Sequence, residues 1–149
     1  MKIFTTRWMF WSISSAMRVI CKRLHRGDDL LCRIRELAEE HQIEAGVLLS
    51  GVGCLLRGRV RDAGGVRLRQ IDEPCEIVSL TGTVSRSRCH LHIALSKENL
   101  STVGGHLTEG CIVNTTCELV VGILDGWHYG VEQDEQTGYD EIVFQEQKP

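Results

Sequence analysis

Along most of this chain, apolar residues either alternate with polar residues or form short runs bounded by glycine, aspartate or serine. Both patterns indicate β-strands. Strands are predicted at 17–24, 43–52, 54–61, 66–71, 75–84, 89–95, 111–124, 127–131 and 141–144. One segment differs, because apolar residues recur every three or four positions between Asp29 and His41. That spacing predicts an amphipathic helix.

Turn residues separate these segments. Gly27 and Asp28 lead into Asp29, a residue type that caps helix N-termini, and Asp125-Gly126 predicts a hairpin turn. The sequence contains no repeat and no internal linker. We therefore predict one α+β domain, in which a mixed, mostly antiparallel sheet of about seven strands packs with one main helix.

The domain is expected to span residues 17–145, followed by a tail at 146–149. Residues 1–16 contain four aromatic and two basic residues but no acidic one. Their apolar stretch is shorter than the roughly 18–20 residues that span a membrane, so no membrane contact is expected. Three interpretations compete for this segment: a weak targeting leader, an apolar arm, or an extension from an upstream translation start. We favour the last, because a regular strand pattern begins at Met17.

Composition narrows the class of protein. The chain of 149 residues is 42% hydrophobic and 25% charged, as in ordinary globular domains. Its net charge of −3 lacks the basic excess that is typical of nucleic-acid binders, although a local basic patch remains open. The seven cysteines form no C-x-x-C pair and mostly lie in apolar runs. This pattern favours buried, reduced thiols in a cytoplasmic protein.

Three of the six histidines are His90, His92 and His106. Residues i and i+2 of a strand share a face, so His90 and His92 should point the same way. Gly104 and Gly105 precede His106 and allow a close backbone approach or a positive φ angle. Three imidazoles at one point would form a zinc-type site with an open coordination position. The alternative is a metal-free, hydrogen-bonded histidine cluster at a subunit interface.

Several ordered motifs resemble the plants and prokaryotes conserved (PPC) domain family. They are Arg-Gly-Asp-Asp-Leu before the helix, Ile-Glu-Ala-Gly-Val from 43, Ser-Gly-Val-Gly from 50, Glu-Ile-Val-Ser-Leu-Thr-Gly from 76, His-Leu-His from 90, Gly-Gly-His-Leu-Thr-Glu-Gly-Cys-Ile-Val from 104, Thr-Cys-Glu-Leu-Val-Val from 116 and Thr-Gly-Tyr-Asp-Glu from 137. The resemblance covers about residues 17–145 and implies a PPC-like fold that assembles as a homotrimer. Some prokaryotic relatives look like metal-binding proteins with histidines at these three positions, which implies zinc or another divalent transition metal here.

Bacterial members of this family are labelled as predicted DNA-binding proteins, so the resemblance also implies DNA as a partner. A basic run provides candidate contacts: Arg57, Arg59, Arg61, Arg67 and Arg69. As a hairpin, these residues could form one basic stripe for a polyanion. They could equally form a solvated outer face. Arg57-Gly-Arg59 is similar to the core of a minor-groove hook, but Val60 replaces its proline and the segment is strand-like.

Glu118 interrupts an apolar strand, where an unpaired carboxylate is costly. It could orient a ligand histidine, act as an acid or base at the metal site, or simply be a salt-bridged edge residue. The chain has no other recognised catalytic signature, so the sequence leaves open whether it is an enzyme. A DNA-binding or regulatory protein with a three-histidine metal site is expected first. A metal-dependent enzyme or a ligand sensor acting on a small molecule is the alternative.

Overall fold

The computed structural model of the protein describes residues 17–147. The predicted leader, residues 1–16, and the last two residues of the tail lie outside the described part. The elements are β1 (Met17–His25), α1 (Leu30–Glu40), β2 (Gly46–Arg61), β3 (Leu68–Ile71), β4 (Cys75–Val84), β5 (Cys89–Lys97), β6 (Thr102–Leu107), β7 (Ile112–Leu124), β8 (Trp127–Gln133) and β9 (Asp140–Glu146). The predicted α+β class and the single main helix are confirmed within residues 17–147.

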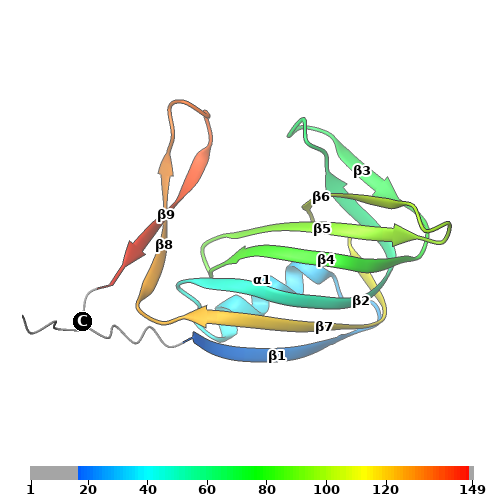
Figure 1. Ribbon diagram of the computed structural model, residues 1–149, viewed down its shortest axis with the longest axis horizontal. Coiled ribbons are helices and arrows are strands. Elements are labelled where there is room, and N and C mark those ends of the chain that lie inside the picture. The colour runs from blue at the N-terminus through cyan, green and yellow to red at the C-terminus, as the bar shows by residue number, and fades with distance from the viewer. Residues whose placement is uncertain (1–16, 148–149) are drawn as a thin grey trace, which may run out of the picture.

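Seven strands form one sheet with the order β1-β7-β2-β4-β5-β6, and β3 pairs with the end of β2. All of the pairings are antiparallel. Figure 1 shows the strands stacked in this order, with β8 and β9 standing away from the sheet as a separate hairpin. The predicted mostly antiparallel sheet of about seven strands is therefore confirmed.

The long strand β2 organises the sheet. Its first part lies between β4 and β7, whereas its last residues pair with β3 and β6. Register shifts against β7 mark bulges, and Gly53 has a φ of 152° at one of them. Bulges bend a strand. The bend lets Val60 and Arg61 pair with Leu107 and His106, so that β2, β4, β5 and β6 form a closed ring of strands.

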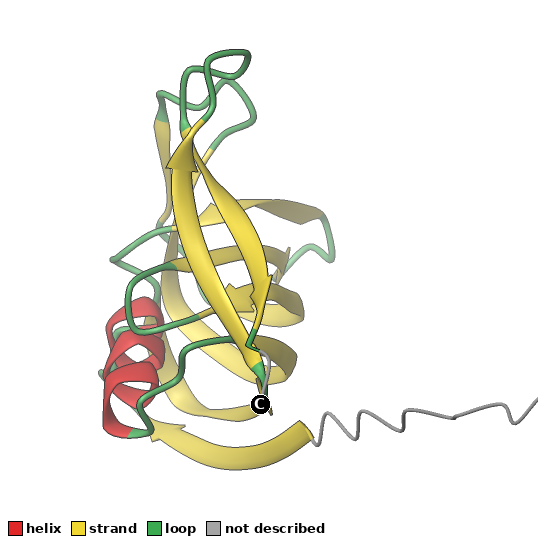
Figure 2. Cartoon of the chain, turned by 90° about the vertical axis from the view of Figure 1, so that its left-hand side faces the viewer, coloured by secondary structure: helices red, strands yellow, loops and turns green. Residues whose placement is uncertain are grey.

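One helix covers one side of this sheet, as Figure 2 shows. Asp29 caps it by accepting hydrogen bonds from the N–H groups of Leu31 and Cys32 at 3.1 and 3.2 Å, while its other oxygen accepts from Gly110 N–H at 2.6 Å. The apolar side of the helix is fully buried through Leu30, Leu31, Ile34, Leu37 and Ala38. These side chains join the inward residues of the strands in one core.

Three details differ from the prediction. The segments predicted at 43–52 and 54–61 are one strand, because Gly53 bends the chain without ending the pairing. Residues 102–107 form the extra strand β6. The Asp125-Gly126 turn does not make a hairpin of β7 and β8, because β8 pairs with β9 instead. Within residues 17–147, no helix has the length and apolarity needed to cross a membrane.

Candidate metal centre

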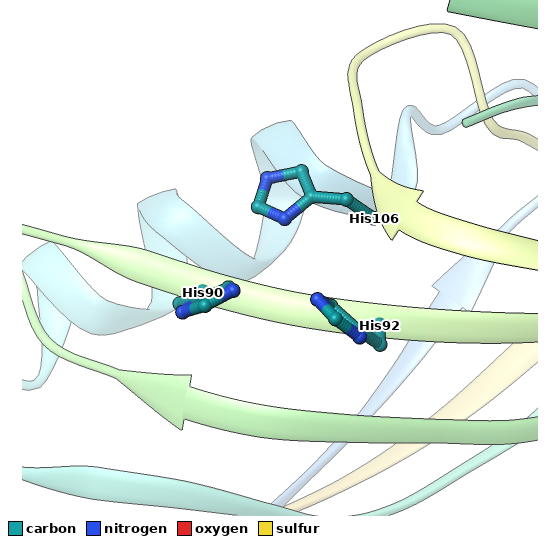
Figure 3. A group of neighbouring side chains, drawn as sticks. All are labelled: His90, His92 and His106. Atoms are coloured by element: carbon teal, nitrogen blue, oxygen red, sulfur yellow. The ribbon is translucent and has the colours of Figure 1, made fainter. Parts of the chain in front are cut away.

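The three candidate histidines come together on β5 and β6. His92 is the direct cross-strand partner of His106, and His90 lies two residues before His92 on the same face. The ring centroids are 5.2 Å apart for His90–His92 and His90–His106, and 5.6 Å apart for His92–His106. Figure 3 shows the three rings turned toward a common point. The cluster lies on the face of β5 opposite to the buried Leu91 and Ile93.

Glycines allow these strands to approach so closely. A Cβ atom on Gly104 or Gly105 would lie 2.5 Å from the carbonyl oxygen of Ile93 or Arg61, respectively. The function of these two glycines is therefore close approach, and neither has a positive φ angle. On the other side of β5, Gly82 has a φ of 145° and lies against the backbone of His90.

Burial and neighbouring charges favour the neutral form of His90 and His106. Burial, followed by the positive charge of Arg61, lowers the pKa of His106 to about 4. Burial also lowers the pKa of His90, together with the charges of His92 and Arg88. Neutral imidazole is the form that binds metal ions, so His90 and His106 are in the metal-binding form at neutral pH.

These residues fit a divalent transition metal. One nitrogen from each histidine lies within 4.8 Å of the other two. A tetrahedral zinc ion with bonds of 2.0–2.1 Å requires about 3.3 Å between ligand nitrogens. Rotation of the imidazole side chains would have to close this difference. The Nδ1 atom of His106 is also buried without a hydrogen-bond partner in the described part, as expected of a nitrogen that awaits a ligand.

Two arginines adjoin the histidine cluster. Arg61 is the cross-strand partner of His106, and Arg88 lies two residues before His90. Arg61 Nε and Arg88 Nη1 are both buried, and neither has a hydrogen-bond partner among the described residues. No local sequence pattern predicts this proximity, because it depends on the β2–β6 register.

The other candidate residues lie elsewhere. Glu118 is exposed on β7, between Arg23 of β1 and Val52 of β2. Because β2 and β4 separate β7 from β5 in the sheet, the structure does not bring Glu118 to the histidines. His128 is not part of the cluster. Its Nδ1 atom lies 2.9 Å from Glu44 Oε2 instead.

The five candidate arginines are divided between the faces of the β2–β3 hairpin. Arg57, Arg59 and Arg61 alternate along β2, with the buried Gly58 and Val60 between them. Arg69 of β3 pairs with Val60, which places it on the other face. Arg69 is also neutralised by Asp62, with an Nε–Oδ2 distance of 3.1 Å. The expected single stripe of five charges is therefore split by the register.

Comparison with known proteins identifies the family of this sequence. The sequence pattern of the Plants and Prokaryotes Conserved (PCC) domain matches residues 12–125. The bifunctional protein GlmU from two Synechococcus strains, JA-2-3B'a(2-13) and JA-3-3Ab, is 32% and 33% identical over 130 and 129 residues. These matches cover 87% of this chain and 21% of GlmU, so the chain spans about a fifth of the length of these curated relatives.

Solved structures share the fold. A hypothetical protein from Salmonella cholerae-suis has a TM-score of 0.87 and 29% identity, covering 91% of this chain and 98% of its own. The metal-containing protein AF0104 from Archaeoglobus fulgidus has a TM-score of 0.72 and 31% identity, and the match covers 85% of this chain and 93% of AF0104. A candidate DNA-binding protein from Bacteroides thetaiotaomicron has a TM-score of 0.75 at 20% identity, and the match covers 87% of this chain and 96% of that protein.

Proposed function

Because the chain belongs to the Plants and Prokaryotes Conserved domain family, we propose that it is a metal-binding member of that family. His90, His92 and His106 would hold zinc or another divalent transition metal. The observation that carries this proposal is the convergence of three imidazole nitrogens within 4.8 Å of one another. The name of the Archaeoglobus relative, a metal-containing protein at 31% identity, supports it.

Three protein ligands leave a position for another molecule. Catalytic zinc sites commonly have three protein ligands, whereas structural sites have four. The ion would supply Lewis acidity to an oxygen atom of a bound molecule. Such a site suits a protein that binds or senses a small molecule. It is also compatible with a metal-dependent enzyme that acts on a small molecule.

The test is the metal content of the protein and of one variant. We expect about one ion per chain by elemental analysis after zinc loading and desalting. His92→Ala removes one of three ligands, so its metal affinity should fall by at least about tenfold. His41→Ala, an exposed histidine at the helix C-terminus, is the matched control and should bind like the wild type. A wild-type protein that takes up no zinc would refute the proposal.

We also propose that the chain assembles as a homotrimer in the cytoplasm. The outer face of the sheet, away from α1, carries exposed apolar side chains at Val19, Leu49, Val52 and Val78. An apolar patch of this kind is typical of a surface that another protein chain covers. The seven cysteines are all free, which supports a reducing compartment.

DNA binding is the second candidate function. Arg57 and Arg67 on the β2–β3 hairpin are exposed and form no ion pair with a described carboxylate. The candidate DNA-binding protein from Bacteroides shares the fold, although 20% identity shows the fold alone. The net charge of −3 makes any such binding dependent on this local patch.

Fluorescence anisotropy with duplex DNA at several salt concentrations tests this function. Binding through phosphates should weaken steeply with salt, and Arg57→Gln with Arg67→Gln should reduce the salt slope by about one per lost phosphate contact. Arg33→Gln is the control, because Arg33 is already paired with Asp28 and Glu36. If the wild type does not bind duplex at low salt, the protein is not a DNA binder.

A further inference from the structure

Three buried nitrogen atoms without hydrogen-bond partners gather at the histidine cluster. Among the described residues, Arg61 Nε, Arg88 Nη1 and His106 Nδ1 are the buried side-chain nitrogen or oxygen atoms that lack a partner. Buried polar groups in folded proteins are nearly always hydrogen-bonded, so each exception requires an explanation. All three belong to one small region, because Arg61 is opposite His106 and Arg88 precedes His90 by two residues.

The two guanidinium groups act on the same imidazole. The positive charges of Arg61 and Arg88 both lower the pKa of His106, and both also affect His90. Neither arginine forms an ion pair with a carboxylate in the part of the chain that the structure describes. Two neighbouring cations with buried, unpartnered donors and no ion pair among the described residues are a set of groups that can bind an anion.

Glu141 is a carboxylate whose charge acts on the cluster, but its hydrogen bond lies elsewhere. Glu141 of β9 raises the pKa of His90, so its charge reaches the cluster. Its Oε1 accepts a hydrogen bond from Thr137 Oγ1 at 3.2 Å within the β8–β9 hairpin. No hydrogen bond joins Glu141 to Arg61 or Arg88, so their buried donors are still available.

We propose that the histidine cluster together with Arg61 and Arg88 is the binding site of a small oxyanion, a carboxylate or a phosphate group. This inference rests on the proposed metal site, because the oxyanion would take the position that three histidines leave free. The planar guanidinium fork of arginine matches the charged oxygens of carboxylates and phosphates better than the single ammonium of lysine does. Arg61 Nε and Arg88 Nη1 would each donate to the anion. The ligand of the protein is therefore an acidic small molecule rather than a neutral one.

The experiment uses the full chain loaded with Co²⁺, whose visible absorption reports on its ligands. Inorganic phosphate and acetate are titrated separately, and the spectrum and the heat of binding are recorded. We expect a saturable change with at least one of the two anions. Arg61→Gln and Arg88→Gln should each weaken that binding by about tenfold or more, since a hydrogen bond to a charged group is lost. Their Co²⁺ affinity should stay within about threefold of the wild type.

Matched variants separate the possible outcomes. Arg69→Gln removes an arginine on the other face of the hairpin and should leave anion binding unchanged. Arg61→Lys keeps the positive charge. If Arg61→Gln folds poorly, Arg61→Lys takes its place in the experiment and should have part of the anion affinity of the wild type. A response to acetate alone or phosphate alone identifies the class of ligand and supports the proposal.

Two results would overturn the inference. The first is a Co²⁺-loaded wild type whose spectrum and heat do not respond to either anion, in which case the metal site stands without an anion site. The second is an anion affinity that neither Arg61→Gln nor Arg88→Gln changes. A protein that binds no Co²⁺ instead refutes the proposed metal function, and calorimetry of phosphate with the metal-free chain then tests the arginine pair alone.

Discussion

Burial makes two of the cysteine side chains, Cys111 and Cys117, chemically unreactive. Burial raises the pKa of Cys111 to about 11 and that of Cys117 to about 12. Both thiols are inaccessible in the core. Because the thiolate is the reactive form, these residues are packing elements rather than nucleophiles.

We expect Cys111 and Cys117 to resist iodoacetamide in the native protein at pH 8. At that pH their thiols are protonated and shielded, so labelling should be slower by at least about a hundredfold than in unfolded protein. Mass spectrometry of peptides after timed alkylation measures this. The same reaction in urea is the control, in which all seven cysteines should be labelled. Rapid native labelling of Cys117 would show that the core opens locally.

At the same scale, the sequence could predict part of the site and not the rest. Strand alternation was sufficient to place His90 and His92 on one face, because the two-residue period is a local property. The contact of Arg61 with His106 depends on the register of two strands that are about 45 residues apart. No local pattern specifies that register, so the sequence alone predicts a nucleic-acid contact for Arg61 and no proximity to His106.

At the scale of elements, close strand pairing positions the cluster. Gly82 of β4 pairs with Leu91, the residue between His90 and His92. A Cβ atom at Gly82 would lie 2.0 Å from the carbonyl oxygen of His90, and its φ of 145° disfavours any other residue. This glycine is therefore required for β5 to lie where the histidines converge.

Gly82→Ala should lower the free energy of unfolding by at least about 2 kcal/mol, because strain and a backbone clash add. It should also weaken zinc binding by shifting His90 relative to His106. Gly138→Ala is the matched control, since Gly138 has a φ of 74° but an added Cβ would meet nothing within 4 Å. Urea unfolding and zinc titration of both variants measure the effects. Equal losses in the two variants would contradict the role of the close approach.

The helix and most strands could be predicted because their apolar periods are local. The helix is an example, since Leu30, Ile34 and Leu37 are buried as their spacing indicates. β2 was divided at Gly53 because glycine usually interrupts a strand, whereas here its positive φ forms a bulge that continues the pairing. β6 was missed because Gly104 and Gly105 weaken its apolar pattern.

At the scale of the whole molecule, the outer sheet face carries exposed apolar side chains in the described residues. Val52 is 56% exposed and Val78 is 60% exposed, although both lie within strands of the main sheet. The face opposite to them is covered by α1. Assembly of copies through this face would bury these exposed valines.

Leu49→Lys should convert the proposed trimer to monomers. A lysine is acceptable in the single chain, because Leu49 is 46% exposed there, but it would bring a charge into an apolar interface beside Met17, since both side chains lie over Gly122. Analytical ultracentrifugation should give three times the chain mass of 16.8 kDa for the wild type and one chain mass for the variant. Val66→Lys, in the exposed turn before β3, should remain trimeric. A wild type that sediments as a monomer would exclude the assembly.

The pairing of β1 with β7 also has a consequence for the synthesis of the chain. This pairing joins residue 17 to residue 124, and β7 is also the neighbour of β2. A ribosome adds about 5–20 residues per second, so roughly 5–20 seconds pass before the first strand of the sheet meets its partner. During that interval, Leu24 is made but cannot be covered by β7, the strand that pairs with it. The β1 segment therefore stays without its partner in the sheet for longer than the strands that follow it.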